Sequence, residues 1–260
     1  LFHLPSESVV AHLVFMAAHP TLFSERYSFS ADYPGALTSA LEATFPGSRA
    51  LLINGAAADL RPRSADFENS GDRIQAFGFA LAEKIKALPY QPLLLDGPWQ
   101  NRLEKIRLPK TELRLGFFKM PGLLGNRFFP RKIYFQVIRL GQVVFFGFPG
   151  ELASEIGKEI EDYALSYRLE PIIAGYSNDY LAYVVPERHY KNRDHYESQV
   201  SFYGPQMDWF VQATFRKILD GLFSSDEKSA LLKPGQRQDK EGLPVLYLDG
   251  PAYHRGLEEG

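Results

Sequence analysis

The stretch KIYFQVIRLGQVVFFGFPGELASEIGKEI, residues 132–160, decides the fold. Its first part has two apolar runs that meet at Leu140-Gly141, a pattern typical of a β-hairpin. Its second part predicts a helix that opens immediately after Pro149-Gly150 and has Glu151 in its first turn. A hairpin that leads directly into a helix indicates a sheet with helices packed on it.

Strands and helices alternate on both sides of this stretch. Apolar runs predict buried strands, and apolar residues at helical spacing between breakers predict helices. The predicted strands are residues 8–20, 48–55 and 170–186, the last interrupted by a polar loop, and the predicted helices are residues 33–47, 70–89 and 203–223. We therefore expect an α/β domain with a mixed β-sheet core and flanking helices over residues 1–223. Residues 224–260 are predicted to form a polar tail with a last strand at 243–250.

The composition excludes several classes of protein. The chain has 260 residues and no cysteine, which rules out disulfides, thiolate metal sites and cysteine catalysis. Its formal net charge is −2, so no basic field points to a nucleic-acid partner. No apolar run reaches the roughly 18 residues that span a bilayer. The chain starts at Leu1 without an initiator Met or a visible signal peptide, and we expect a fragment or a processed form.

Polar residues gather where apolar strands end. His19 follows the first strand, the run NGAAADLRPR starts at Asn54, and the run GYSNDYLAY contains Tyr183. Strand ends that lead into loops are where α/β proteins assemble their sites. The imidazole of His19, the carboxylate of Glu151 and the phenol of Tyr183 form a set that can hold zinc.

Each of these residues also has an ordinary explanation. A histidine at a strand end is commonly structural, and the helix dipole favours a glutamate such as Glu151 in a first turn. Tyr183 suits a core position in a chain with 14 Tyr. The Gly-Ala loop after Asn54 suits either a turn or a place where the backbone approaches a ligand closely. The residue patterns alone leave both explanations open.

Five segments, taken in order, resemble a known family. They are FMAAHPTLFSERYSFSADYPG, LLINGAAADLRPR, FPGELASEIGKEI, IIAGYSNDYLAYVVPERHY and HYESQVSFYGP. Over residues 9–219, and most loosely over 64–140, the chain is similar to the neutral/alkaline non-lysosomal ceramidases. The resemblance implies the ceramidase catalytic-domain fold and a zinc-dependent hydrolase of sphingolipid metabolism that cleaves the N-acyl amide of ceramide. It also implies a secreted, periplasmic or cell-surface location.

The resemblance gives roles to individual residues. The implied zinc ligands are His19 of HPT, Glu151 of PGE and Tyr183, the second tyrosine of the family's NxYxxY stretch. Tyr196 of HYE matches a tyrosine near the reacting carbonyl, where it would donate a hydrogen bond to the developing negative oxygen. The resemblance therefore implies an amidase site built from residues that lie far apart in the sequence.

Further residues are implied to support this site. Tyr180, the first tyrosine of NxYxxY, is expected on the substrate side together with Asn54 and Gly55. Asp32 and Gly35 match the family's Asp-x-x-Gly, and we expect them to brace the loop that presents His19.

The chain departs from the family at two points. The family's other zinc histidine lies in a THTH-like segment ahead of these pieces, and His3 and His12 stand in other contexts. Where ceramidases have GDVSPN, with a serine at the reaction centre, this chain has ADLRPR, with Arg61 at that position. A guanidinium cannot act as a serine, so we expect an N-acyl substrate other than ceramide. Arg61 is expected either to act in the catalytic site, where it grips a carboxylate or phosphate of the substrate, or to pair with Asp59 or another acid and order the loop.

One loop suits contact with a membrane. PGLLGNRFFPRK, residues 121–132, mixes apolar and basic side chains, as peripheral membrane anchors do; the alternative is a Phe-rich turn packed on the core. The function predicted overall is zinc-dependent hydrolysis of the amide bond of a small-molecule or lipid-like N-acyl substrate. The alternative is a catalytically inactive ceramidase-like binding domain, or a fragment, with an incomplete metal site.

Overall fold

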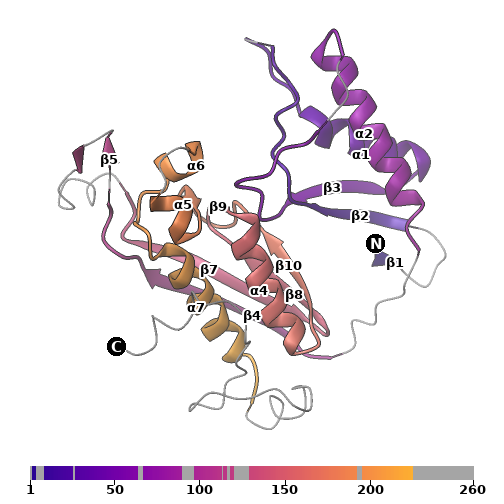
Figure 1. Cartoon of the computed structure of the whole chain (residues 1–260). Helices are drawn as coiled ribbons and strands as arrows, with labels where there is room; N and C mark the ends of the chain where they lie inside the picture. The colour runs from indigo at the N-terminus through magenta and orange to yellow at the C-terminus, as the bar shows by residue number, and fades with distance from the viewer. Residues whose placement is uncertain are drawn as a thin grey trace.

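The computed structural model describes residues 2–3, 9–25, 27–63, 67–89, 97–112, 114–115, 118–119, 129–191 and 195–224, and the statements below concern these residues. Helices pack on mixed β-sheets (Figure 1), which confirms the predicted α/β fold class. No helix in these ranges is long and apolar enough to cross a membrane.

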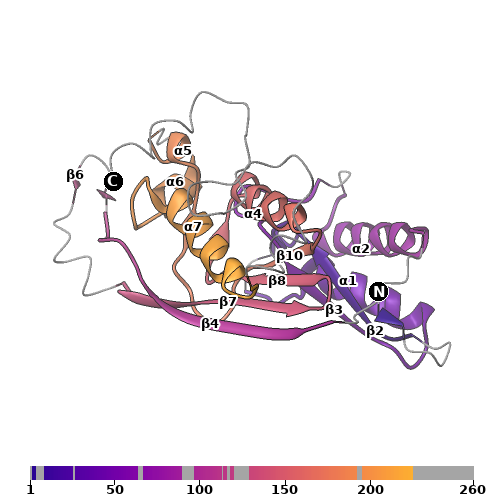
Figure 2. The same ribbon diagram turned by 90° about the horizontal axis from the view of Figure 1, so that it is seen from below.

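The larger sheet contains the predicted hairpin. Its strand order is β10-β8-β7-β4, with β4 Trp99–Arg107, β7 Lys132–Leu140, β8 Val143–Gly147 and β10 Glu170–Ala174. β4, β7 and β8 run antiparallel, and β10 is parallel to β8. The β7–β8 turn needs Gly141, whose φ of 59° is in the left-handed region. Helices α4 (Ser154–Ser166) and α7 (Met207–Asp220) cover one face of this sheet (Figure 2).

The smaller sheet carries the segment that leads to His19. Its strand order is β1-β2-β3, with β1 Phe2–His3, β2 Val9–Met16 and β3 Arg49–Asn54. β2 and β3 are parallel and are connected through α1 (Asp32–Thr44), which packs beside α2 (Ser70–Lys86). A Cβ at Gly78 would lie 2.5 Å from the Cβ of Ala36, so this glycine permits the close approach of α2 to α1.

The two sheets meet where β3 and β10 end. The backbone N–H of Gly175 donates to the carbonyl of Asn54 at 2.8 Å, and the ring of Phe15 on β2 contacts Phe145 on β8 at 5.8 Å between centroids. A third, two-stranded sheet pairs β9 (Glu151–Leu152) in parallel with β11 (Tyr183–Val184). The ends of strands from all three sheets therefore lie together.

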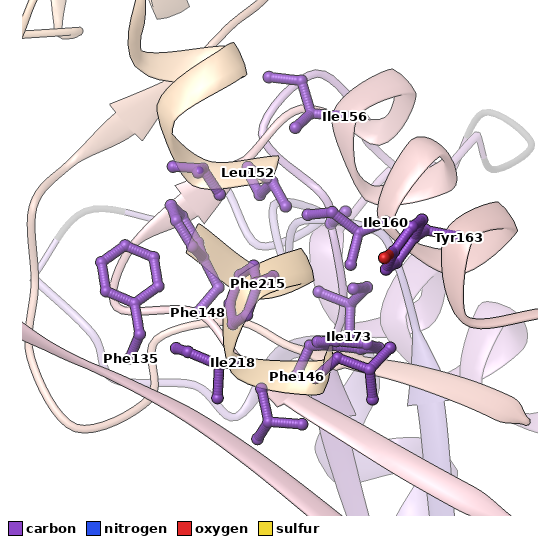
Figure 3. Packing of buried hydrophobic residues seen from close by; sticks show 14 of the residues in the cluster. Phe135, Phe146, Phe148, Leu152, Ile156, Ile160, Tyr163, Ile173, Phe215 and Ile218 are labelled. Atoms are coloured by element: carbon purple, nitrogen blue, oxygen red, sulfur yellow. The ribbon is translucent and has the colours of Figure 1, made fainter. Parts of the chain in front are cut away.

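The largest core cluster lies between the larger sheet and the helices on it (Figure 3). Phe215 of α7 contacts the rings of Phe135, Phe146 and Phe148 at centroid distances of 5.2, 5.3 and 6.4 Å. These four side chains are at most 1% exposed, so they contribute strongly to the stability of the sheet that carries the site.

The helix predicted from Glu151 begins later than expected. Glu151 lies in β9 and not in a first helical turn, and α4 starts at Ser154. The N–H of Glu151 donates to Ala182 and that of Ala153 to Val184, so this backbone is held extended against β11. The prediction was wrong because a two-residue strand pair leaves no local pattern in the sequence.

The remaining elements are short. They are β5 Arg114–Leu115, β6 Phe118–Lys119, α5 Glu187–Lys191 and α6 Tyr196–Gln199. Residues 121–128 of the predicted membrane loop, the polar tail from 225 and its predicted strand lie outside the described residues. Phe129, at the described end of that loop, packs on the core, with its ring 4.5 Å from that of Phe202.

Candidate metal centre

His19 and Glu151 meet side by side in a pocket. The Nε2 atom of His19 lies 3.3 Å from Oε2 of Glu151, and the side chains are 18% and 8% exposed. His19 follows β2, and its N–H donates to the carbonyl of Leu60 at 3.0 Å. The pocket has a volume of about 550 Å³, and its polar wall includes Asn54, Tyr176 and both of these side chains.

Three tyrosine hydroxyls surround the carboxylate of Glu151. Tyr180 donates a hydrogen bond to Oε1, and Tyr176 and Tyr183 also hydrogen-bond this carboxylate. Burial first, and then the carboxylate of Glu151, raise the pKa of all three tyrosines above the ordinary value. At neutral pH the three phenols are therefore protonated donors toward one carboxylate.

Tyr183 lies between His19 and Tyr196. It is the register partner of Glu151 across β9–β11, and its ring centroid is 6.2 Å from that of His19. The ring of Tyr196, which is 64% exposed, packs edge-on against Tyr183 at 5.9 Å. The structure thus brings together the three residues predicted as zinc ligands and places Tyr196 next to them.

The loop that presents His19 is braced from within. The carboxylate of Asp32 accepts from the N–H groups of Phe23 at 2.7 Å and Tyr33 at 2.6 Å. The hydroxyl of Tyr33 donates to the carbonyl of Ala18 at 2.7 Å, and burial, with the charge of Asp32, raises the pKa of Tyr33 to about 12. These bonds fix the chain on both sides of the histidine, as expected for Asp32.

The loop after Asn54 ties the two halves of the site together. On one side, Oδ1 of Asn54 accepts from the N–H of Ala18 at 3.3 Å. On the other, the carboxylate of Asp59 accepts from the N–H of Ser154 at 2.7 Å and from its hydroxyl at 2.9 Å. Asp59 therefore caps α4 just after Glu151, and the relative position of the two sides depends on this loop.

Two predicted residues of this loop lie outside the pocket. Arg61 is exposed, does not line the pocket and has no ion pair within the described ranges. No ion pair between Arg61 and Asp59 is found within the described residues, and Asp59 instead accepts two hydrogen bonds from Ser154. Gly55 is also absent from the pocket wall; a Cβ there would lie 3.4 Å from that of Ala17. Asn54 does line the pocket, whereas Tyr180 reaches the site through its bond to Glu151.

The donor atoms suit zinc. Two ligands about 2.0–2.1 Å from one tetrahedral zinc lie roughly 3.3 Å apart, which is the separation of His19 Nε2 and Glu151 Oε2. Among the described residues, the buried Nε2 atom has no hydrogen-bond partner, as expected of a lone pair that serves a metal. Within the part of the chain that the structure describes, no group of three or more histidine or acidic side chains could hold a metal. A third protein ligand would therefore be the phenol of Tyr183.

Two other histidine features lie outside this site. His12 on β2 is 1% exposed, packs its ring 4.7 Å from that of Phe45, and has no partner for either ring nitrogen. His189 and His195 pack against each other at 5.6 Å. The residue that sequence reasoning missed is Tyr176, whose hydroxyl lies 3.4 Å from Nδ1 of His19. Its only signal was its place two residues after the strand that ends at Ala174.

A pocket at the meeting point of mixed sheets places the chain among α/β proteins whose site is built from strand ends and loops. No protein-family model matches the chain. It is 25% identical over 190 residues to the neutral ceramidase of Oryza sativa subsp. japonica, over 67% of this chain and 23% of that protein. This match, together with two solved structures of similar fold, supports the predicted resemblance of the chain to neutral ceramidases.

The two solved structures share the fold. One is described as a ceramidase complexed with C2; it has a TM-score of 0.67, 18% identity and covers 79% of this chain. The other is neutral ceramidase from Pseudomonas aeruginosa, with a TM-score of 0.67, 20% identity and coverage of 85% of this chain. The chain spans 44% of each solved ceramidase and about a quarter of the curated relative.

Proposed function

We propose that the protein is a zinc-dependent hydrolase of the amide bond of an N-acyl lipid. The observation that carries the proposal is the 3.3 Å separation of His19 Nε2 and Glu151 Oε2 in a pocket that also contains Tyr183. The likeness to proteins named as ceramidases supports the substrate class.

His19, Glu151 and Tyr183 would hold the zinc. Three protein ligands leave one position open, as in catalytic zinc sites. When bound there, zinc polarises a carbonyl and lowers the pKa of a coordinated water to about 7. The hydroxyls of Tyr176 and Tyr180 hold the carboxylate of Glu151 in place by donating to it.

Tyr196 is proposed to stabilise charge on the substrate. Its ring packs on Tyr183, which lines the pocket, and it is 64% exposed, so its hydroxyl is open to a substrate that binds beside Tyr183. A hydrogen bond donated to that oxygen as it becomes negative lowers the barrier by about 3 kcal/mol when well placed.

The pocket suits an acyl chain. Its volume of about 550 Å³ is within the range of small-molecule sites, and Pro20, Pro34 and Leu52 give it apolar wall area. The exposed rings of Tyr176 and Tyr180 stack with an interplanar angle of 6° beside it. Arg61 does not line this pocket, so its charge does not oppose the binding of a neutral lipid there. A preference of Arg61 for anionic substrates is a separate prediction.

The experiment measures zinc and hydrolysis together. The purified chain is loaded with zinc and washed, and the zinc bound per chain is measured by mass spectrometry. The release of fatty acid is then measured with two substrates, a short-chain ceramide and an N-acyl amino acid. We expect one zinc per chain and release from at least one substrate, both abolished by Glu151→Ala. The control is Glu83→Ala on α2, whose carboxylate is 69% exposed. Hydrolysis that persists in Glu151→Ala would reject the site.

A second candidate is a ceramidase-like binding domain without catalysis. It is favoured by the absence, within the described residues, of a third histidine or acidic ligand beside His19 and Glu151. In this case the protein would bind a labelled ceramide but would hold no zinc and release no fatty acid. The same measurement therefore separates the two candidates.

A further inference from the structure

Tyr176 contacts two of the proposed zinc ligands, His19 and Glu151. It follows β10 in a loop where its φ of 55° turns the chain back toward the pocket that it lines. Its hydroxyl lies 3.4 Å from Nδ1 of His19 and also hydrogen-bonds Glu151 and Asn54. No other residue of the pocket wall has a hydroxyl that contacts both His19 and Glu151 within the described hydrogen bonds.

The hydrogen-bond capacity of these groups allows Nδ1 of His19 to be the donor to Tyr176. Oδ1 of Asn54 accepts from the N–H of Ala18, so its amide NH₂ is the group directed at the Tyr176 oxygen. The hydrogen-bond partners of Asn54 therefore assign which side of its amide is the oxygen and which is the NH₂ group. A phenol donates once and accepts twice. The Tyr176 hydroxyl can therefore donate to Glu151 and still accept from both Asn54 and a protonated Nδ1 of His19.

We propose that Tyr176 is a positioning residue that holds His19 in the tautomer with the proton on Nδ1, so that the lone pair of Nε2 is free to bind zinc beside Glu151. This inference rests on the proposed function, because it requires His19 to be a metal ligand through Nε2. Metal-binding histidines generally donate their other ring N–H to a fixed partner, and here that partner is a phenol shared with Glu151.

Two observations support this assignment independently of each other. Nε2 of His19 is buried without a hydrogen-bond partner, so the ring presents one nitrogen to Tyr176 and leaves the other available. The ring of Tyr176 stacks on Tyr180 at 6.2 Å, which fixes the position of the hydroxyl. The 3.4 Å distance is long for an N–H···O bond, so we expect it to shorten when zinc binds.

The test is Tyr176→Phe, which removes the hydroxyl and keeps the stacked ring. Zinc affinity is measured by competition with a chromophoric chelator, and the tautomer of His19 by ¹⁵N NMR of the imidazole in the zinc-loaded protein. We expect zinc to bind about 10- to 100-fold more weakly and the Nδ1–H signal of His19 to shift or exchange faster. Tyr27→Phe, on a side chain that is fully exposed, is expected to change neither reading.

A second variant separates this role from a general effect on Glu151. Tyr180→Phe removes another hydroxyl that donates to Glu151 but leaves the contact between Tyr176 and His19 intact. It is expected to weaken zinc binding without moving the His19 signals. Circular dichroism of each variant without metal checks that the fold is retained.

The outcomes distinguish the two proposals. If the unchanged chain binds zinc and Tyr176→Phe binds it equally well with the same His19 tautomer, the inference about Tyr176 is overturned and the proposed function stands. If Tyr176→Phe and Tyr180→Phe have the same effect on the His19 signals, the inference is again overturned. If the unchanged chain binds no zinc, both proposals fail.

Discussion

Glu151 and Tyr183 are register partners across two parallel strands of two residues each, β9 and β11. Neighbouring strands lie about 4.8 Å apart, so this pairing places a carboxylate and a phenol side by side. His19 reaches them from the end of β2 in the three-stranded sheet, and its Nε2 lies 3.3 Å from Oε2 of Glu151. The site therefore exists only where the sheets meet, and its geometry depends on the loops that hold them together.

Glycine at position 150 is required for the β9–β11 pairing. A Cβ there would lie 2.5 Å from the carbonyl oxygen of Ala182, a backbone atom that cannot move alone. Gly150→Ala is expected to lower the free energy of unfolding by about 1–3 kcal/mol and to weaken zinc binding, because β11 must shift. Urea unfolding measures the first effect. Gly221→Ala, where a Cβ meets only ordinary contacts at 3.4 Å, is the control and should change little.

The Asp59–Ser154 cap is expected to contribute to stability as a pair. Asp59→Ala removes both hydrogen bonds to Ser154 at the start of α4 and should cost about 1 kcal/mol. A double-mutant cycle with Ser154→Ala isolates the part that the hydroxyl carries. Strictly additive effects in that cycle would show that the hydroxyl bond contributes nothing.

Buried His12 makes stability depend on pH. Burial lowers the pKa of His12 below its ordinary value of about 6.5, so the unfolded chain takes up a proton before the folded one does. The free energy of unfolding should therefore fall as the pH decreases through about 6.5 toward the lower pKa of the folded state. Urea unfolding at about pH 7.5 and pH 5.5 measures this change.

Two histidine variants check the source of this dependence. His12→Leu removes the buried imidazole and should reduce the loss of stability on acidification. His195→Gln, on an exposed side chain, should retain the behaviour of the unchanged protein. Equal pH dependence in His12→Leu and the unchanged protein would assign the effect to other groups.

The hydroxyl of Tyr196 is expected to act in the reaction and not in folding. Tyr196→Phe keeps the ring that packs on Tyr183 and removes one donor from an exposed position. The value of kcat should fall about 100-fold with little change in KM, since the bond forms as charge develops on the substrate oxygen. Steady-state kinetics on a short-chain ceramide decides this. An unchanged kcat would show that the hydroxyl of Tyr196 takes no part in the reaction.

Local signals in the sequence predict most of the fold. The β7–β8 hairpin follows from its apolar runs and Gly141, and helices α1, α2 and α7 follow from apolar spacing between breakers. The place of Glu151 could not be predicted, because β9 exists only through pairing with β11, which lies far along the chain. A glutamate before a helix looks locally like a glutamate in its first turn.

The candidate site was predictable only in part, for the same reason. His19, Glu151 and Tyr183 were grouped because polar residues follow the ends of apolar strands, and the resemblance to a family then gave them their roles as ligands. Tyr176 was missed, since its contact with His19 depends on its left-handed backbone and on the meeting of two sheets. Arg61, which stands at the position of the family's serine, is exposed and does not line the pocket.

The most direct test of the central claim is the location of zinc in crystals of the zinc-loaded chain, by anomalous diffraction at the zinc edge. The account predicts one peak about 2 Å from Nε2 of His19, a carboxylate oxygen of Glu151 and the hydroxyl oxygen of Tyr183. A zinc peak at other residues, or no peak in protein that is folded and saturated with zinc, would contradict it.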